Sequence, residues 1–148
     1  MITIDELLRT KDNKDVYTIA PEDTVFKALQ LMADKDVGAL PVIKDGKPVG
    51  FFSERDYARK IILKGRASLD TPVSEIMAPF AITVTPDHSV DTCMSIMTER
   101  RIRHLMVMER GRLVGVISMR DLVEVTIKAE EDRITRLEDY IVGQDYGH

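Results

Sequence analysis

The chain has 148 residues, of which 44% are hydrophobic and 31% charged, and its 25 acidic and 21 basic side chains leave a formal net charge of −4. This composition is typical of a globular protein, and the acidic excess argues against binding of nucleic acid over the whole surface. One cysteine, Cys93, cannot pair within the chain, and no cysteine and histidine cluster at metal-ligand spacing predicts a zinc site.

The first half of the chain reads as a β-α-β-β-α unit preceded by a short helix. Thr3 and Glu6 have capping-box spacing, which predicts that a helix begins there. Apolar periodicity, an Asp-Gly turn signal and breaking residues define the rest. The expected elements are a strand at 17–20, a helix at 24–36, strands at 39–43 and 49–52, and a helix at 53–63.

The second half repeats this pattern. Shifting the sequence by 65 positions aligns 17–56 with 82–121 without a gap, and 12 of the 40 aligned positions are identical. Two copies are too few for a solenoid, so we predict that they pack face to face about a pseudo-twofold axis. The expected elements are a short helical connector at 72–77, a strand at 82–84, a helix at 90–100, strands at 105–108 and 113–117, and a helix from 118.

The last helix is expected to continue to about Tyr140. Ile127, Ile134 and Ile141 are seven residues apart, which indicates either a short coiled coil or an amphipathic helix packed on its own chain. The resulting division is a first repeat with its N-terminal helix at 1–70, a second repeat at 71–125 and a helical tail at 126–148.

A Gly-x-x-Ser-x-x-Asp motif ends the hairpin of each copy, where a strand leads into a helix. Ser-x-x-Asp is close to a capping box, which stabilises a helix by about 1 kcal/mol. A short carboxylate at a helix start also binds the two hydroxyls of a ribose, and the glycine leaves room for a flat group against the strand. The motif residues are Gly50, Ser53 and Asp56, and Gly115, Ser118 and Asp121, with Arg55 and Arg120 beside the aspartates.

A basic stretch, 100–104, leads into the middle strand of the second copy, where the first copy has only Val37, Gly38 and Ala39. Strand alternation directs at least one basic group toward the cleft between the copies. The alternative is a solvated loop balanced by Glu99 and Glu109. A phosphate subsite built here would be basic on one side of the molecule only.

The doubled pattern, the motif in both copies, and the stretches 38–42 and 103–107 resemble a tandem pair of cystathionine-β-synthase (CBS) domains, a Bateman module, over about 1–125. The resemblance implies an α/β (α+β) fold of two β-α-β-β-α repeats with pseudo-twofold symmetry. It implies a cleft with two sites for AMP, ADP, ATP, S-adenosylmethionine or a related adenosyl compound. It also implies a homodimer formed through the helices after Ser53 and Ser118.

The resemblance further implies roles for individual residues. Asp56 and Asp121 would hold ribose hydroxyls, with Ser53 and Ser118 nearby. Adenine would lie between apolar strand residues, namely Tyr17, Ile19, Val37, Ala39 and Pro41 in one half and Ile82, Val84, Ile102, Leu105 and Met106 in the other. Met106 replaces a proline common in the family. Asp56 would share its site with Arg103, His104 and Arg120, and Asp121 with Arg55, Gly38 and Ala39, so we expect the Asp56 site to prefer the phosphorylated ligand.

We therefore expect a regulatory module that binds AMP, ADP or ATP and modulates a separate partner chain or its own oligomer. No catalytic motif accompanies His104 or Cys93, so we expect neither an enzyme nor a catalytic cofactor or metal. The alternatives are NAD(H) or S-adenosylmethionine as ligand, nucleic-acid binding through the arginines of 100–112, and a ligand-free dimerisation scaffold. We expect a cytoplasmic protein without a membrane partner, because neither a signal peptide nor a run of about 18 apolar residues is found.

Overall fold

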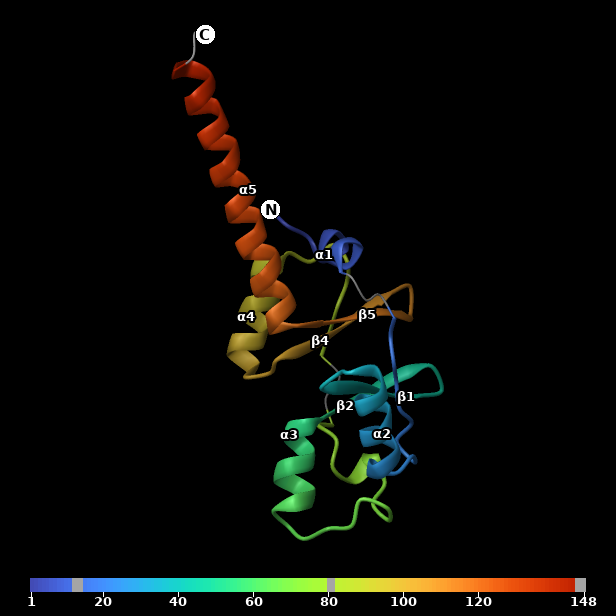
Figure 1. The fold of residues 1–148 in the computed structure, drawn as a ribbon. Helices are drawn as coiled ribbons and strands as arrows, with labels where there is room; N and C mark the ends of the chain where they lie inside the picture. The colour runs from blue at the N-terminus through green and yellow to red at the C-terminus, as the bar shows by residue number, and fades with distance from the viewer. Residues whose placement is uncertain (12–14, 80–81, 146–148) are drawn as a thin grey trace.

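The computed structural model describes residues 1–11, 15–79 and 82–145 of this chain (Figure 1). These residues form two α+β units, each with a small sheet. The elements of the first repeat lie together at one end of the molecule, and those of the second lie at the other. The last three residues of the expected tail, 146–148, lie outside the described residues.

The first repeat follows the predicted order with one shortened strand. Its elements are α2 (Val25–Lys35), β1 (Ala39–Lys44), β2 (Lys47–Ser53), α3 (Glu54–Tyr57) and a π-helical turn η1 (Ala58–Ile62). The strand expected at 17–20 is reduced to a single parallel bridge between Ile19 and Val42. In the second repeat Met106 N–H donates to the Ile82 carbonyl. Pro41 is the equivalent of Met106 and has no N–H, so the first repeat cannot extend this ladder.

The second repeat has a three-stranded sheet in the order β3-β4-β5. Its elements are β3 (Thr83–Val84), α4 (Val90–Arg100), β4 (His104–Glu109), β5 (Arg112–Ser118) and α5 (Met119–Asp145). The β4–β5 hairpin is antiparallel and pairs His104 with Ser118, as the β1–β2 hairpin pairs Ala39 with Ser53. Both hairpins turn through two residues with positive φ, Asp45-Gly46 and Arg110-Gly111, as expected of a tight two-residue turn.

The hydrophobic core of each repeat includes residues of a segment that lies, in the sequence, just before the other repeat. The N-terminal helix α1 (Ile4–Thr10) places Ile4 and Leu7 in the core of the second repeat. The connector, with the 3₁₀ turn η2 (Val73–Glu75), places Val73 and Ile76 in the core of the first. The backbone contacts are equivalent too, because Thr3 bridges to Ser89 and Pro72 bridges to Thr24. The two segments that precede the repeats, α1 and the connector, are thus exchanged between the repeats. As a result, neither core forms from one continuous stretch of chain.

The helix α5 begins in the second core, where Leu122 is fully buried, and then extends away from the rest of the molecule (Figure 1). It has 27 residues and therefore continues beyond Tyr140, where we expected it to end. In the part of the chain that the structure describes, no helix combines the length and hydrophobicity needed to cross a membrane.

Candidate functional site: the Asp121 pocket

The two Ser-x-x-Asp corners form complete capping boxes. Ser53 N–H donates to Asp56 Oδ2 (3.1 Å), and Asp56 N–H donates to Ser53 Oγ (3.2 Å). At the second corner the corresponding distances are 2.8 Å and 3.1 Å. The capping interpretation is therefore confirmed in both copies. Both carboxylates remain partly accessible, with side-chain exposures of 20% for Asp56 and 22% for Asp121.

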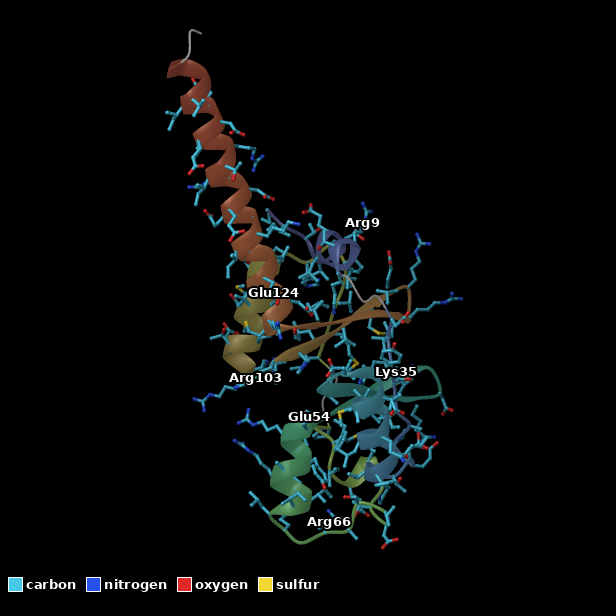
Figure 2. The ribbon with its side chains drawn as sticks, viewed as in Figure 1. Arg9, Lys35, Glu54, Arg66, Arg103 and Glu124 are labelled. Carbon is cyan, nitrogen blue, oxygen red and sulfur yellow. The ribbon has the colours of Figure 1, made fainter. Side chains whose placement is uncertain are left out.

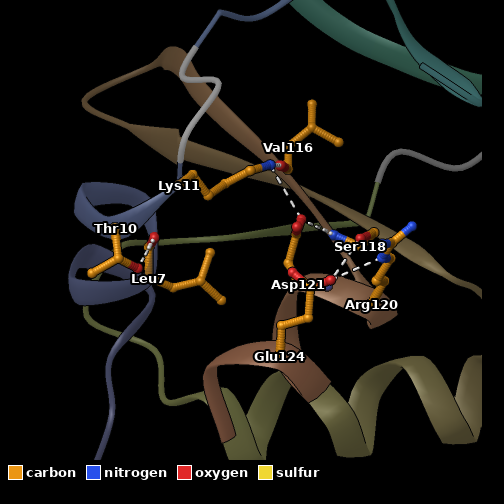
Figure 3. Close-up of polar contacts among 8 residues, drawn as sticks. All are labelled: Leu7, Thr10, Lys11, Val116, Ser118, Arg120, Asp121 and Glu124. Atoms are coloured by element: carbon orange, nitrogen blue, oxygen red, sulfur yellow. Dashed lines mark hydrogen bonds and ion pairs between the residues drawn. The ribbon is translucent and has the colours of Figure 1, made fainter. Parts of the chain in front are cut away.

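Each aspartate is paired with a lysine, and the ammonium group of that lysine donates a second hydrogen bond to a backbone carbonyl. Lys11 Nζ lies 3.1 Å from Asp121 Oδ2 and donates to the carbonyl of Val116 at 2.9 Å (Figure 3). Lys60 Nζ lies 3.5 Å from Asp56 Oδ1 and donates to the carbonyl of Ile76 at 3.1 Å. The sequence analysis missed both lysines. Helical i,i+4 spacing could have found Lys60, but no local signal connects Lys11 with a residue 110 positions away.

A pocket of about 500 Å³ opens beside Asp121, between the two repeats. This volume lies within the range of small-molecule sites. Among the residues that we selected from the sequence, the pocket brings together Tyr17, Val37, Gly38, Ala39, Pro41, His104, Ser118 and Asp121. Arg9, Lys11 and Asp36 are among the lining residues that the sequence analysis did not select.

The family model of the CBS domain matches residues 4–63 and 73–128. The chain belongs to the CBS domain family. It is 40% identical over 127 residues to the CBS domain-containing protein CBSX3, mitochondrial, of Arabidopsis thaliana, covering 82% of this chain but only 62% of that protein. It is 34% identical to the CBS domain-containing protein YhcV of Bacillus subtilis, covering 72% of this chain and 76% of that one.

Solved structures of CBS-domain proteins have the same fold. A protein with CBS domains from Burkholderia ambifaria superposes with a TM-score of 0.81 at 43% identity, covering 85% of this chain and 94% of that one. The CBS-domain protein ATU1752 from Agrobacterium tumefaciens gives a TM-score of 0.77 at 34% identity, covering 84% and 98%. The predicted pair of repeats and its α+β fold are therefore confirmed.

The remaining selected residues of this CBS pair do not line the Asp121 pocket. Ile19, Val84 and Met106 are buried, with at most 4% of their surface exposed. Arg120 Nε instead pairs with Glu124 Oε1 at 2.9 Å on the exposed side of α5. Arg103 lies at the edge of the second repeat (Figure 2). The others outside this pocket are Ser53, Arg55, Asp56, Ile82, Ile102 and Leu105.

The structure places His104 in the lining of the Asp121 pocket. We assigned it to Asp56, but the β4–β5 register sets it opposite Ser118, and its ring lines the Asp121 pocket. The ring stacks on Phe51, with centroids 5.5 Å apart and planes at 27°. Burial lowers the pKa of His104 below its ordinary value, although Asp121 acts in the opposite direction. The lowered pKa favours the neutral form of the ring at pH 7.

The two motif glycines make room for the protein itself. A Cβ on Gly50 would lie 2.5 Å from the carbonyl oxygen of Ala78, and one on Gly115 would lie 2.7 Å from a methyl group of Leu8. At Gly50 the connector fills the space that we expected for a flat ligand group, whereas Gly115 lines the Asp121 pocket beside Leu8. At Gly50 the close approach of the connector backbone requires the absence of a side chain, whereas at Gly115 the contact is with the movable Leu8 side chain of α1.

Cys93 belongs to the second core and is completely buried. Burial raises the pKa of its thiol to about 11. Among the described residues, no group of three or more histidine, cysteine, aspartate and glutamate side chains is arranged to hold a metal ion.

Proposed function

We propose that this CBS pair is a regulatory module that binds an adenine nucleotide, AMP, ADP or ATP, in the Asp121 pocket. Ligand occupancy would then change the affinity of the module for a partner chain or for another copy of itself. The observation that carries the proposal is one pocket that joins a partly accessible helix-start carboxylate, apolar walls from the other repeat and cationic side chains.

Three groups of lining residues match the three parts of a nucleotide. The carboxylate of Asp121 is an acceptor for the two ribose hydroxyls, and it is held in place by its own capping bonds. Tyr17, Val37 and Pro41 offer an aromatic and apolar surface for the base. Lys11 and Arg9 supply positive charge for a phosphate.

The position of these cations supports a preference opposite to the one that we expected from the sequence. Lys11 lies directly at Asp121 and Arg9 lines the same pocket, and the sequence analysis assigned neither cation to this half. We therefore propose Asp121, rather than Asp56, as the site of the phosphorylated ligand. The Asp56 corner remains a proposed second site of lower affinity.

Relatives with this fold support an adenosyl ligand and a role in assemblies. The CBS domain pair of protein MJ0100, which shares the fold with a TM-score of 0.76 at 21% identity, was solved in complex with 5-methylthioadenosine and S-adenosyl-L-methionine. A CBS-CP12 protein from bloom-forming cyanobacteria, with a TM-score of 0.74 at 28% identity, is hexameric. We propose a homodimer through the helices after Ser53 and Ser118 as the form that senses the ligand. A cytoplasmic location stays a prediction, since one relative is named as mitochondrial.

Ligand titration by calorimetry tests the proposal on the intact chain. AMP, ATP, S-adenosylmethionine and NADH are titrated into the wild type and into Asp121→Asn and Asp56→Asn variants. The amide keeps the capping geometry but removes the charge, so both variants are expected to fold. We expect AMP or ATP to bind most tightly and Asp121→Asn to weaken binding at least about tenfold, which is about 1.4 kcal/mol.

Asp56→Asn is the matched control, and we expect it to change this affinity by no more than about twofold, well under 1 kcal/mol. Equal losses in both variants would overturn the assignment of the ligand to the Asp121 pocket. Preferential binding of NADH or S-adenosylmethionine would replace the nucleotide by the corresponding alternative ligand. A chain that binds none of the four compounds would leave only a structural role for the module.

A further inference from the structure

A narrow apolar stripe runs along the solvent-exposed part of α5. Each of its side chains is exposed by 41% to 56% although all are aliphatic, and the stripe consists of Val123, Ile127, Ile134, Leu137 and Ile141. At 100° per residue these positions fall within about 80° of the helix surface, which is the narrow seam of a coiled coil rather than the wider face of a helix packed on a globular core. We call this surface the α5 seam.

Within the described part of the chain, the α5 seam is left about half exposed. The apolar residues of α5 that pack on the second core are Met119, Leu122 and Val125, all in its first two turns. Beyond them the helix extends away from the body of the molecule (Figure 1). About 20 residues of isolated helix are marginal in water, because most helices are stabilised by packing of their apolar face. The family model ends at residue 128, so most of the seam is an addition to the CBS pair.

We propose that the α5 seam binds the same seam of a second copy of this chain, as a short parallel coiled coil over residues 123–142. The inference is independent of ligand binding and concerns a surface other than the ligand pocket. With Ile127, Ile134 and Ile141 at a positions, Val123 and Leu137 fall at d positions, so two copies bury matching side chains. A seam that pairs with itself satisfies the symmetry of a twofold dimer.

The charges beside the seam select the parallel orientation. In a parallel pair, Arg133 at a g position faces Glu138 of the other copy at an e position, so two opposite-charge contacts form. An antiparallel pair would instead bring Glu131 of one copy beside Glu138 of the other. Residues 123–145 carry seven acidic and three basic side chains, a balance that disfavours an anionic membrane surface as the alternative occupant.

Glu130 is the polar interruption of the seam. It occupies the d position between Val123 and Leu137, and Arg133 Nε lies 3.9 Å from its carboxylate on the same helix. In the parallel pair two such carboxylates come close together, which weakens the dimer. Glu130→Leu is therefore expected to tighten association at least about tenfold, because it continues the apolar seam and removes the repulsion. A tighter dimer with the helix content of the wild type could not be explained by misfolding of the variant.

Sedimentation equilibrium and disulfide trapping test the proposal on the full chain. Ile134→Gln is expected to weaken the dimer at least about tenfold. Val142→Gln is the matched control, because Val142 is equally exposed at 51% but lies outside the seam. With oxidised glutathione, L137C is expected to cross-link rapidly into dimers and V142C slowly, while the buried Cys93 stays unreactive.

Three results would overturn the proposal. The first is a wild-type chain that remains monomeric at all concentrations measured. The second is a self-association constant that both Ile134→Gln and Glu130→Leu leave unchanged, since association would then depend entirely on other surfaces, such as the helices after Ser53 and Ser118. The third is cross-linking of L137C no faster than that of V142C, which excludes the parallel arrangement.

Discussion

The pair formed by Lys11 and Asp121 makes the most direct prediction for stability. Lys11→Met keeps the apolar stem of the side chain and removes an ammonium that lies 3.1 Å from the carboxylate and 2.9 Å from the Val116 carbonyl. A hydrogen bond to a charged group contributes about 1.5–3 kcal/mol, and the exposures of 27% and 22% reduce this to about 1–2 kcal/mol. For a chain of this size the expected loss of melting temperature is about 2–8 °C.

Lys60→Met is the matched control for this change. Lys60 holds the equivalent place at Asp56, but its distance of 3.5 Å and exposure of 39% make a weaker pair. We expect Lys60→Met to cost at most about 1 kcal/mol. Urea unfolding of both variants measures the difference. Equal losses, or a larger loss for Lys60→Met, would refute the argument that the Lys11 pair is the stronger one.

The same substitution separates the roles of Lys11 in ligand binding. A ribose bound to Asp121 would displace the ammonium from the carboxylate oxygen that it now contacts, and the ammonium would become available to the phosphate. Lys11→Met is therefore expected to lower the preference for AMP over adenosine by about tenfold, without weakening adenosine itself. Calorimetric titration of both ligands gives this ratio. An unchanged ratio would refute a phosphate contact by Lys11.

Three further measurements follow from the packing. Gly50→Ala should destabilise the chain by more than about 2 kcal/mol, because the added methyl group meets the rigid backbone at Ala78. Gly115→Ala should cost less, because its methyl group meets the movable Leu8 side chain. Chemical denaturation compares the two variants, and the reverse order would contradict the packing argument. The pKa of His104 is lowered on folding, so the unfolded chain binds more protons, and the free energy of unfolding falls as the pH drops from about 6.5 toward the folded pKa. The free energy of unfolding of His104→Gln should depend less steeply on pH. The same pH dependence in the wild type and the variant would count against a buried neutral ring. The Cys93 thiol, with its pKa raised to about 11, should react with a thiol reagent only at the rate of unfolding, so rapid reaction of the native chain would disprove its burial.

Local features of this protein were readable in advance. The bounds of α4 match the predicted helix, and both Ser-x-x-Asp corners cap their helices as their spacing indicates. Such features depend on residues within four positions of each other, and their patterns are therefore visible in the chain. The shortened strand at Ile19 shows the limit of this approach, since its cause is a proline 22 positions away on the neighbouring strand.

The position of the pocket could not be read in the same way. Lys11 meets a carbonyl 105 residues away, and the exchange of α1 and the connector decides which core each completes. Periodicity tells which face of a helix is apolar, but not which of two similar cores receives it. The duplication, the secondary structure and the family pattern thus followed from order along the chain. Packing between distant segments decided the space at the glycines, the neighbour of His104 and the cation at Asp121. These features could not be predicted, because contacts between distant segments produce no periodic pattern in the sequence.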